Sequence, residues 1–278
     1  DYMELMSNWA QTSEFNKSDY MIRVGEPLGQ MYGYRLLGIY SVDDFTYDAT
    51  NKKYIIKEGI PYDKNNYPKP GYWKFEDTDN SGMITEEDRT IIGNANPKLY
   101  GGLTNNFTWK GFDLSVFLNF SIGNKIYGAN QMYYTKFNNR WRNTLKDKAL
   151  DRFTVMNDKG EYIFDDPEQL AAVNKDRHYV SIDGSSNLSF HSGYVEDGSF
   201  LKINNISLGY TLPKSLVTKI KLSNVRFYAT GYNLHTFTKY SGYDPEVNTC
   251  ANNGLTPSID WGAYPSAISV VFGANISF

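Results

Sequence analysis

The 278-residue chain is long enough to bury one large core or two modest ones. Its net charge of -3 and its scattered basic residues argue against nucleic-acid binding. No apolar run approaches the roughly 18 residues of a membrane helix, which excludes a helical membrane protein. A transmembrane barrel is not excluded, because only every second residue of its strands must be apolar. The aromatic content of 16%, rich in tyrosine, suits such a barrel and a soluble β-sandwich equally.

The first third of the chain predicts two strands and a long loop. Alternating apolar and polar residues over 20–24 predict a strand that Gly25 and Pro27 end. Residues 30–40 predict a second, curved strand in which glycines relieve the bend. Residues 41–97 are irregular and rich in proline. A connection of that length is usually functional.

An acidic stretch in this connection has the spacing of an EF-hand calcium loop, and we name residues 77–88 the Asp loop. Glycine stands at position 6 of the twelve-residue frame and isoleucine at position 8. The predicted ligands are Asp77, Asp79, Ser81, the carbonyl group of Met83, Thr85 and Asp88. Because Asp88 replaces the usual glutamate, bidentate coordination is harder and the preference for Ca2+ over Mg2+ is weaker. The predicted cofactor is still Ca2+, with Mg2+ less favoured. The alternative is an acidic turn that only needs its glycine.

The strands that follow have two different faces. Residues 100–110 and 112–120 predict a β-hairpin in which apolar residues alternate with small polar ones, as expected of strands that lie between two solvents. Phe117 is the one apolar residue on the polar face of the second strand. Residues 200–212 predict a strand whose apolar phase slips at Asn204, so a bulge is expected there. Residues 225–237 predict the next strand.

Aromatic side chains in the long connections are candidate binding residues. The candidate contacts for a substrate or partner are Tyr133, Tyr134 and Trp141. The alternative for aromatic residues is an interfacial girdle, which we expect for Tyr100 and Tyr240 at strand ends. Catalysis is not predicted, because the three histidines lie in different segments and no nucleophile elbow or phosphate loop occurs.

Several short motifs follow one another in a definite order. They are residues 24–34 (Val-Gly-Glu-Pro-Leu-Gly-Gln-Met-Tyr-Gly-Tyr), the Asp loop with residues 93–98 (Gly-Asn-Ala-Asn-Pro-Lys), residues 112–115 (Phe-Asp-Leu-Ser), residues 194–202 and a terminal phenylalanine. Together they resemble the SusC/RagA family of TonB-dependent outer-membrane receptors over most of the chain. The last strand, with Phe272, Ile276 and Phe278 on its apolar face, also resembles the signal that barrel-assembly machinery recognises.

The resemblance implies an all-β fold. Residues 1–278 would be antiparallel strands of the C-terminal section of a transmembrane β-barrel of about 22 strands. The plug domain, the TonB box and the signal peptide would lie outside this chain. Long extracellular loops would span about residues 41–97, 123–198 and 239–266. Short periplasmic turns would lie at residues 25–29, 110–111 and 213–224, with the C-terminus on the periplasmic side.

The resemblance also implies a function. The chain would be part of an outer-membrane importer of oligosaccharides or peptides that works with a SusD-like surface lipoprotein. Its other partners would be the N-terminal part of the receptor, TonB through that part, and outer-membrane lipid. The alternative function is a soluble β-rich carbohydrate-binding module with a structural calcium site. Such a module would have no lipid-facing belt of apolar side chains.

Overall fold

The chain divides into two compact units, each built from segments far apart in sequence. The computed structural model describes residues 4–7, 19–23, 25–137, 143–184, 190–252 and 254–278. The first unit contains Asp1–Asn94, Tyr127–Val195 and Cys250–Trp261. The second unit contains Ala95–Ile126, Glu196–Thr249 and Gly262–Phe278. Within the described residues, no helix is both long enough and apolar enough to cross a membrane.

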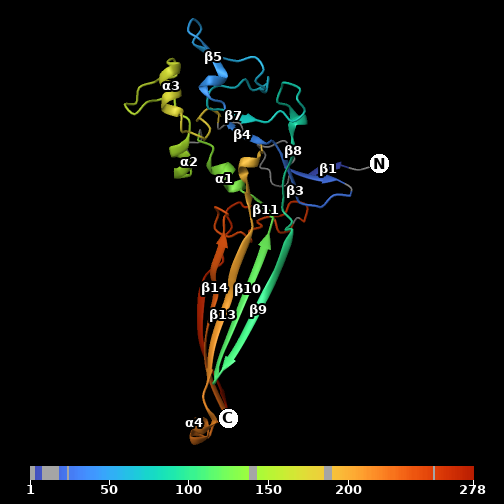
Figure 1. Cartoon of the computed structure of the whole chain (residues 1–278), viewed down its shortest axis with the longest axis vertical. Helices are drawn as coiled ribbons and strands as arrows, with labels where there is room; N and C mark the ends of the chain where they lie inside the picture. The colour runs from blue at the N-terminus through green and yellow to red at the C-terminus, as the bar shows by residue number, and fades with distance from the viewer. Residues whose placement is uncertain (1–3, 8–18, 24, 138–142, 185–189, 253) are drawn as a thin grey trace. The chain divides into compact units, whose positions relative to one another are not determined.

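The second unit is one antiparallel sheet of five long strands in the order β15-β14-β13-β10-β9 (Figure 1). The strands are β9 (Leu99–Trp109), β10 (Phe112–Ile122), β13 (Phe200–Thr211), β14 (Asn224–Thr238) and β15 (Ser269–Ser277). A short helix, α4 (Lys214–Val217), lies between β13 and β14. Strands of 9 to 15 residues are long enough to cross a bilayer, since a tilted transmembrane strand needs about 9–11 residues.

The two faces of this sheet differ in chemistry, as the alternation predicts. Leu114 pairs with Leu208 on one face, and the adjacent Ser115 pairs with Ser207 on the other. Side chains of the apolar face are exposed; Phe272, for example, is 79% exposed. A soluble sheet would bury such a face, whereas a membrane-spanning barrel exposes it to lipid. The described strands therefore carry the lipid-facing belt that the soluble alternative would lack.

The predicted bulge in the strand after residue 200 is confirmed. The register between β13 and β10 shifts at Asn204, and the register between β13 and β14 shifts at the same level. On β14 the extra residues are Asn233 and Leu234, and Asn233 has a positive φ of 52°. Adjacent bulges re-aim side chains out of the regular alternation.

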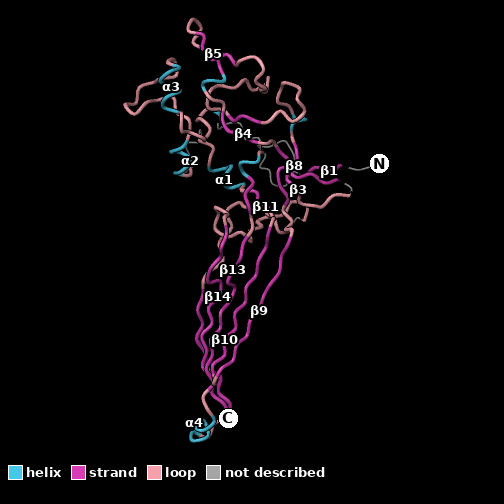
Figure 2. Tube along the Cα trace, viewed as in Figure 1, coloured by secondary structure: helices cyan, strands magenta, loops and turns pink. Residues whose placement is uncertain are grey.

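The first unit consists mainly of loops joined by short strands and helices (Figure 2). A four-stranded sheet contains β1 (Glu4–Ser7), β2 (Tyr20–Arg23), β3 (Gln30–Gly33) and β8 (Thr90–Asn94). Two ladders pair β4 (Leu36–Ile39) with β7 (Trp73–Phe75) and β5 (Phe45–Asp48) with β6 (Lys53–Ile56). The helices are α1 (Ala129–Tyr134), α2 (Lys146–Asp151) and α3 (Pro167–Asn174). The three-residue strands β11 (Lys125–Tyr127) and β12 (Val195–Asp197) lie where the chain passes from one unit to the other.

The prediction of one curved barrel strand over residues 30–40 is wrong. The chain forms β3 and β4 there, each four residues long and in different sheets. Pairing with a distant segment explains the break, because Tyr34 forms a bridge with His191 and its amide donates to the Phe190 carbonyl group. The strand β2 is equally short. Residues 25–29 therefore do not connect two membrane-length strands.

Aromatic clusters form the core of the first unit. Phe153 and Leu170 lie in one buried cluster with Tyr40 and Tyr54. A second cluster contains Tyr34, Trp73, Phe75, Ile84 and Val180. Through Ile84 this second cluster supports the Asp loop.

Candidate functional site

The Asp loop folds around its own carboxylates. The Asp77 carboxylate accepts hydrogen bonds from the amides of Ser81 (3.1 Å) and Gly82 (2.8 Å). Asp79 Oδ1 also accepts from the Ser81 amide, at 2.9 Å. Asn80 (φ 58°) and Gly82 (φ 80°) adopt the left-handed backbone that makes so tight a turn. Hydrogen bonds from Ser81 lower the pKa of Asp79.

Asp88 links the two ends of the Asp loop through hydrogen bonds. It is buried at the end of a short 3-10 helix, Glu86–Asp88, which begins after Thr85. Its Oδ1 accepts from the Thr78 amide and its Oδ2 from the Thr85 amide, both at 2.7 Å. The shorter arm of aspartate thus joins the beginning and the end of the loop.

The structure brings three of the six predicted metal ligands together as carboxylates. One oxygen each from Asp77, Asp79 and Asp88 lies within 4.8 Å of the others. Oxygens about 2.3–2.6 Å from a shared Ca2+ ion fall within such a separation, and each carboxylate has lone pairs beyond those used by the amides. The three carboxylates therefore fit one divalent cation.

The other predicted ligands are engaged with the backbone. The Ser81 hydroxyl donates to the Met83 carbonyl group at 3.1 Å. The Thr85 hydroxyl accepts from the Glu87 amide at 3.2 Å and caps the short helix. Each of these oxygens keeps a lone pair beyond these contacts, so the contacts do not exclude the three residues as further ligands.

The aromatic candidates are only partly brought together. Tyr133 and Tyr134 lie at the end of α1, with their ring centroids 5.6 Å apart. Trp141 lies outside the described residues. The ring next to Tyr133 is instead that of Trp261, at 6.1 Å, from a segment more than 120 residues later in the chain. Neither local spacing nor composition in the sequence signals this pairing.

The two tyrosines expected in a girdle behave differently. Tyr100 is 76% exposed at the start of β9, but it pairs with Ser121 on the polar face, so it does not lie on the apolar face where a girdle would be. Tyr240 is only 6% exposed and packs with Ile126 and Val247. The girdle prediction is therefore wrong for both tyrosines, for Tyr240 because its loop folds back and buries the ring.

The residues of the predicted assembly signal lie at the end of the chain, in and just after β15. Phe272 and Ile276 project from the apolar face, where they pair with Ala229 and Val225 of β14. Phe278 follows the strand and is exposed. Recognition of these residues by assembly machinery stays a prediction.

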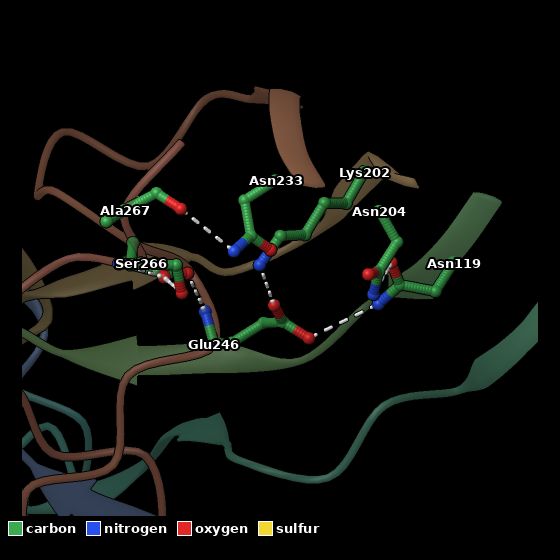
Figure 3. A network of polar contacts seen from close by, with 8 residues as sticks. Asn119, Lys202, Asn204, Asn233, Glu246, Ser266 and Ala267 are labelled. Carbon is green, nitrogen blue, oxygen red and sulfur yellow. Dashed lines mark hydrogen bonds and ion pairs between the residues drawn. The ribbon is translucent and has the colours of Figure 1, made fainter. Parts of the chain in front are cut away.

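A polar network on the other face of the sheet was not predicted. Asn119 and Lys202 are register partners on β10 and β13. Figure 3 shows Glu246, from the loop after β14, between them: its Oε2 accepts from Lys202 Nζ at 2.6 Å and its Oε1 from the Asn119 amide at 3.2 Å. The Asn204 amide reaches Asn119 Oδ1 at 3.4 Å.

The same loop is held by a second carboxylate. Asp244 accepts from the Glu246 amide (3.0 Å) and from the amide and hydroxyl of Ser266 (3.3 and 2.8 Å). Burial raises the pKa of Asp244, but these hydrogen bonds and the charge of Lys202 outweigh burial and leave the pKa below its usual value. Figure 3 also shows Asn233, the bulged residue of β14, donating to the Ala267 carbonyl group at 3.1 Å.

An ion pair crosses the sheet near the 110–111 turn. Arg226 on β14 reaches over β13 to Asp113 on β10, with Nε 2.9 Å from Oδ1. The pair passes above Gly209, where an added Cβ would lie within 2.6 Å of both side chains. The alternation in the sequence predicts that both charged side chains lie on the polar face. Their contact cannot be predicted without the order of the strands, because β13 lies between β10 and β14.

Comparison with known proteins identifies this architecture, although no family model matches the sequence. A TonB-dependent receptor of Formosa agariphila is 30% identical over 264 residues, which are 93% of this chain and 23% of that protein. The chain belongs to the TonB-dependent receptor family. A second receptor of F. agariphila is 28% identical and aligns with 97% of this chain and 27% of that receptor. The TonB-dependent receptor SusC of Bacteroides thetaiotaomicron is 28% identical and aligns with 83% of this chain and 20% of SusC.

Solved structures agree on the fold of this receptor chain. A chain of the RagAB peptide transporter superposes with a TM-score of 0.64 at 19% identity, covering 99% of this chain and 25% of that chain. The same transporter in an "open-open" state gives a TM-score of 0.61. The chain therefore spans about a quarter of the length of its relatives, and its long sheet is part of a barrel. Its relatives are receptors, which fits the prediction that it is not an enzyme.

Proposed function

We propose that this receptor chain is part of a TonB-dependent importer of the outer membrane that takes up oligosaccharides or peptides. The observation that carries the proposal is the sheet of five long strands, with exposed apolar side chains on one face and a hydrogen-bonded charged network on the other. A barrel in lipid needs that arrangement, with its polar face toward the interior. The relatives named SusC and RagAB peptide transporter support the import of a nutrient.

The proposal requires further strands. Among the described residues, β9 and β15 each pair on one side only, and an open sheet edge is not viable in lipid. We expect the strands and the plug that complete the barrel to come from the larger part of the receptor that the relatives have in addition. TonB would act through that part. The 110–111 turn and α4 would face the periplasm. The long connections of about residues 41–97, 123–198 and 239–266 would lie outside, where a SusD-like lipoprotein would bind.

Purification from the source membrane tests this function. The receptor should require mild detergent, and mass spectrometry should detect a SusD-like lipoprotein in matched amounts. Uptake of labelled oligosaccharides or peptides should cease when the receptor gene or TonB is deleted. Recovery of the chain as a soluble monomer without detergent would contradict the proposal and favour the carbohydrate-binding module.

We also propose that the Asp loop holds Ca2+ through Asp77, Asp79 and Asp88. The ion would stiffen the loop, whose Ile84 lies in the core and whose Met83 forms a bridge with Tyr62. At a hundred times its dissociation constant, bound Ca2+ should stabilise the first unit by about 2.7 kcal/mol. Thermal unfolding with Ca2+ and with a chelator measures this difference. It should vanish in Asp77→Asn and persist in Asp165→Asn, an exposed carboxylate outside the loop. Equal unfolding of the wild type in both conditions would refute the site.

A further inference from the structure

Lys202 is an unusual residue for the polar face of the sheet because its charged side chain is only 5% exposed. Lysine is almost never buried without a partner, since an unpaired ammonium group loses its hydration at high cost. The partner of Lys202 does not come from a strand. It is Glu246, 44 residues later in the loop that follows β14.

The contact has the form of a binding site that one carboxylate occupies. Asn119 and Lys202 sit opposite each other on adjacent strands, and each donates to a different oxygen of Glu246. The bulged Asn204 supports Asn119 from the side. Two donors on rigid strands, one of them charged, are matched to two carboxylate oxygens.

The loop does not depend on Glu246 alone for its position. We name residues 240–247 the anchored segment. Asp244 binds Ser266, and the amide and hydroxyl of Ser241 donate to Glu196 at 2.9 and 2.8 Å. Tyr240 and Val247 add apolar contacts with Ile126. Loss of the Glu246 carboxylate should therefore leave the fold intact and expose Lys202.

We propose that Lys202 and Asn119 form a carboxylate-binding site on the polar wall of the strands, and that Glu246 is an internal ligand which a carboxylate of the cargo displaces. This inference rests on the proposed import function. The cargo carboxylate belongs either to a peptide, at its C-terminus or an acidic side chain, or to an acidic sugar. The Glu246 side chain is 38% exposed, so an incoming carboxylate has access to the group it replaces.

Chemical labelling of Lys202 in the whole receptor in detergent tests the site without any transport assay. The rate of amine acetylation at Lys202, measured by mass spectrometry relative to the exposed Lys110, should be low in the wild type. In Glu246→Gln it should rise about tenfold or more, because a hydrogen bond to a charged group shifts an equilibrium by that much. Glu58→Gln, at an exposed carboxylate elsewhere, should leave the rate unchanged.

Acetate is the probe for the emptied site. In Glu246→Ala, which removes the side chain that glutamine would leave in the site, acetate should slow the labelling of Lys202 and leave that of Lys110 unchanged. Chloride at the same ionic strength should not slow the labelling of Lys202. Equal effects of acetate and chloride would overturn the carboxylate site. An unchanged labelling rate in Glu246→Gln would overturn the role of Glu246 as its ligand.

Labelling of the Glu246 carboxylate identifies the source of the cargo carboxylate. In the wild type, coupling of an amine to Glu246 by a carbodiimide, measured relative to the exposed Glu58, should rise with an acidic ligand and not with its neutral counterpart. One arm compares a tripeptide acid with the tripeptide amide, and the other compares digalacturonate with its methyl ester. A response to the tripeptide acid would indicate a peptide cargo, and a response to digalacturonate would indicate an acidic sugar. No response in either arm would overturn displacement by cargo, while the labelling result would stand independently of the import function.

Discussion

The two units place the same kinds of side chain in opposite surroundings. In the first unit aromatic rings are buried together, and Phe153 is only 2% exposed within its cluster. In the second unit comparable rings, such as Phe272, project from the sheet and are exposed. The difference shows that the first unit is organised against water, whereas the sheet is organised between lipid and a polar interior. Substitutions whose effect depends on whether a side chain contacts protein, water or lipid should distinguish the two units.

The largest effect is expected in the core of the first unit. Phe153→Ala should destabilise that unit by about 3–5 kcal/mol, because a buried aromatic ring leaves a cavity when it is removed. Phe272→Ala removes the same atoms from a face that contacts lipid and should cost much less. Chemical denaturation of the receptor in detergent, followed by hydrogen exchange in each unit, measures both. Equal losses would remove the distinction between the units.

The next effect concerns two adjacent residues on opposite faces of β10. Val116→Arg should cost about 2–4 kcal/mol, because it places a charge in lipid near the middle of β10. Ser115→Arg should be tolerated on the polar face. Folding yield and unfolding in lipid vesicles report the difference. A larger loss for Ser115→Arg would mean that the faces are assigned the wrong way round.

A pH dependence should separate the units next. Burial lowers the pKa of His191, in the first unit, to about 3. Above pH 6.5 the imidazole is neutral in the folded and unfolded states and has no effect. Between pH 6.5 and 3 only the unfolded state binds the proton, so the free energy of unfolding decreases as the pH is lowered. At pH 5 it should be about 2 kcal/mol smaller than at neutral pH. Thermal unfolding of the first unit should show this loss in the wild type and in His178→Asn. The loss should be absent in His191→Asn. A wild-type stability that does not change between pH 6.5 and 5 would refute the effect of burial on His191.

The smallest effect is expected for the ion pair on the polar face. Asp113 and Arg226 are partly exposed, so water and salt screen their attraction. A double-mutant cycle with Asp113→Asn and Arg226→Gln should give a coupling energy of about 0.5–1 kcal/mol that decreases at high salt. Zero coupling at low salt would show that the two side chains do not interact in the assembled barrel.

The parts that sequence could predict are those with local patterns. The alternation over residues 112–120 and the phase slip at Asn204 are visible in consecutive residues, and both appear in the sheet register. The three carboxylates of the Asp loop also come together as their spacing predicts. In each case the determining contacts are between neighbours in the chain or follow from a period of two.

The parts that sequence could not predict depend on distant contacts. The break of residues 30–40 into β3 and β4 depends on the pairing of Tyr34 with His191, about 160 residues away. The burial of Lys202 depends on a loop residue that no local pattern connects to it. The hydroxyl groups of Ser81 and Thr85 form hydrogen bonds with nearby backbone groups, and the spacing of the ligands in the sequence does not predict these bonds.

The most direct test of the central claim is a cysteine-accessibility scan along β10 in intact outer membranes. The native Cys250 is first replaced by serine, and single cysteines are then placed at residues 113–119. A water-soluble thiol reagent should label cysteines at the odd-numbered positions, which face the polar interior. It should not label cysteines that replace Leu114, Val116 or Leu118, which face lipid. Labelling of both sets at similar rates would show that neither face contacts lipid, and the chain would not be part of a membrane barrel.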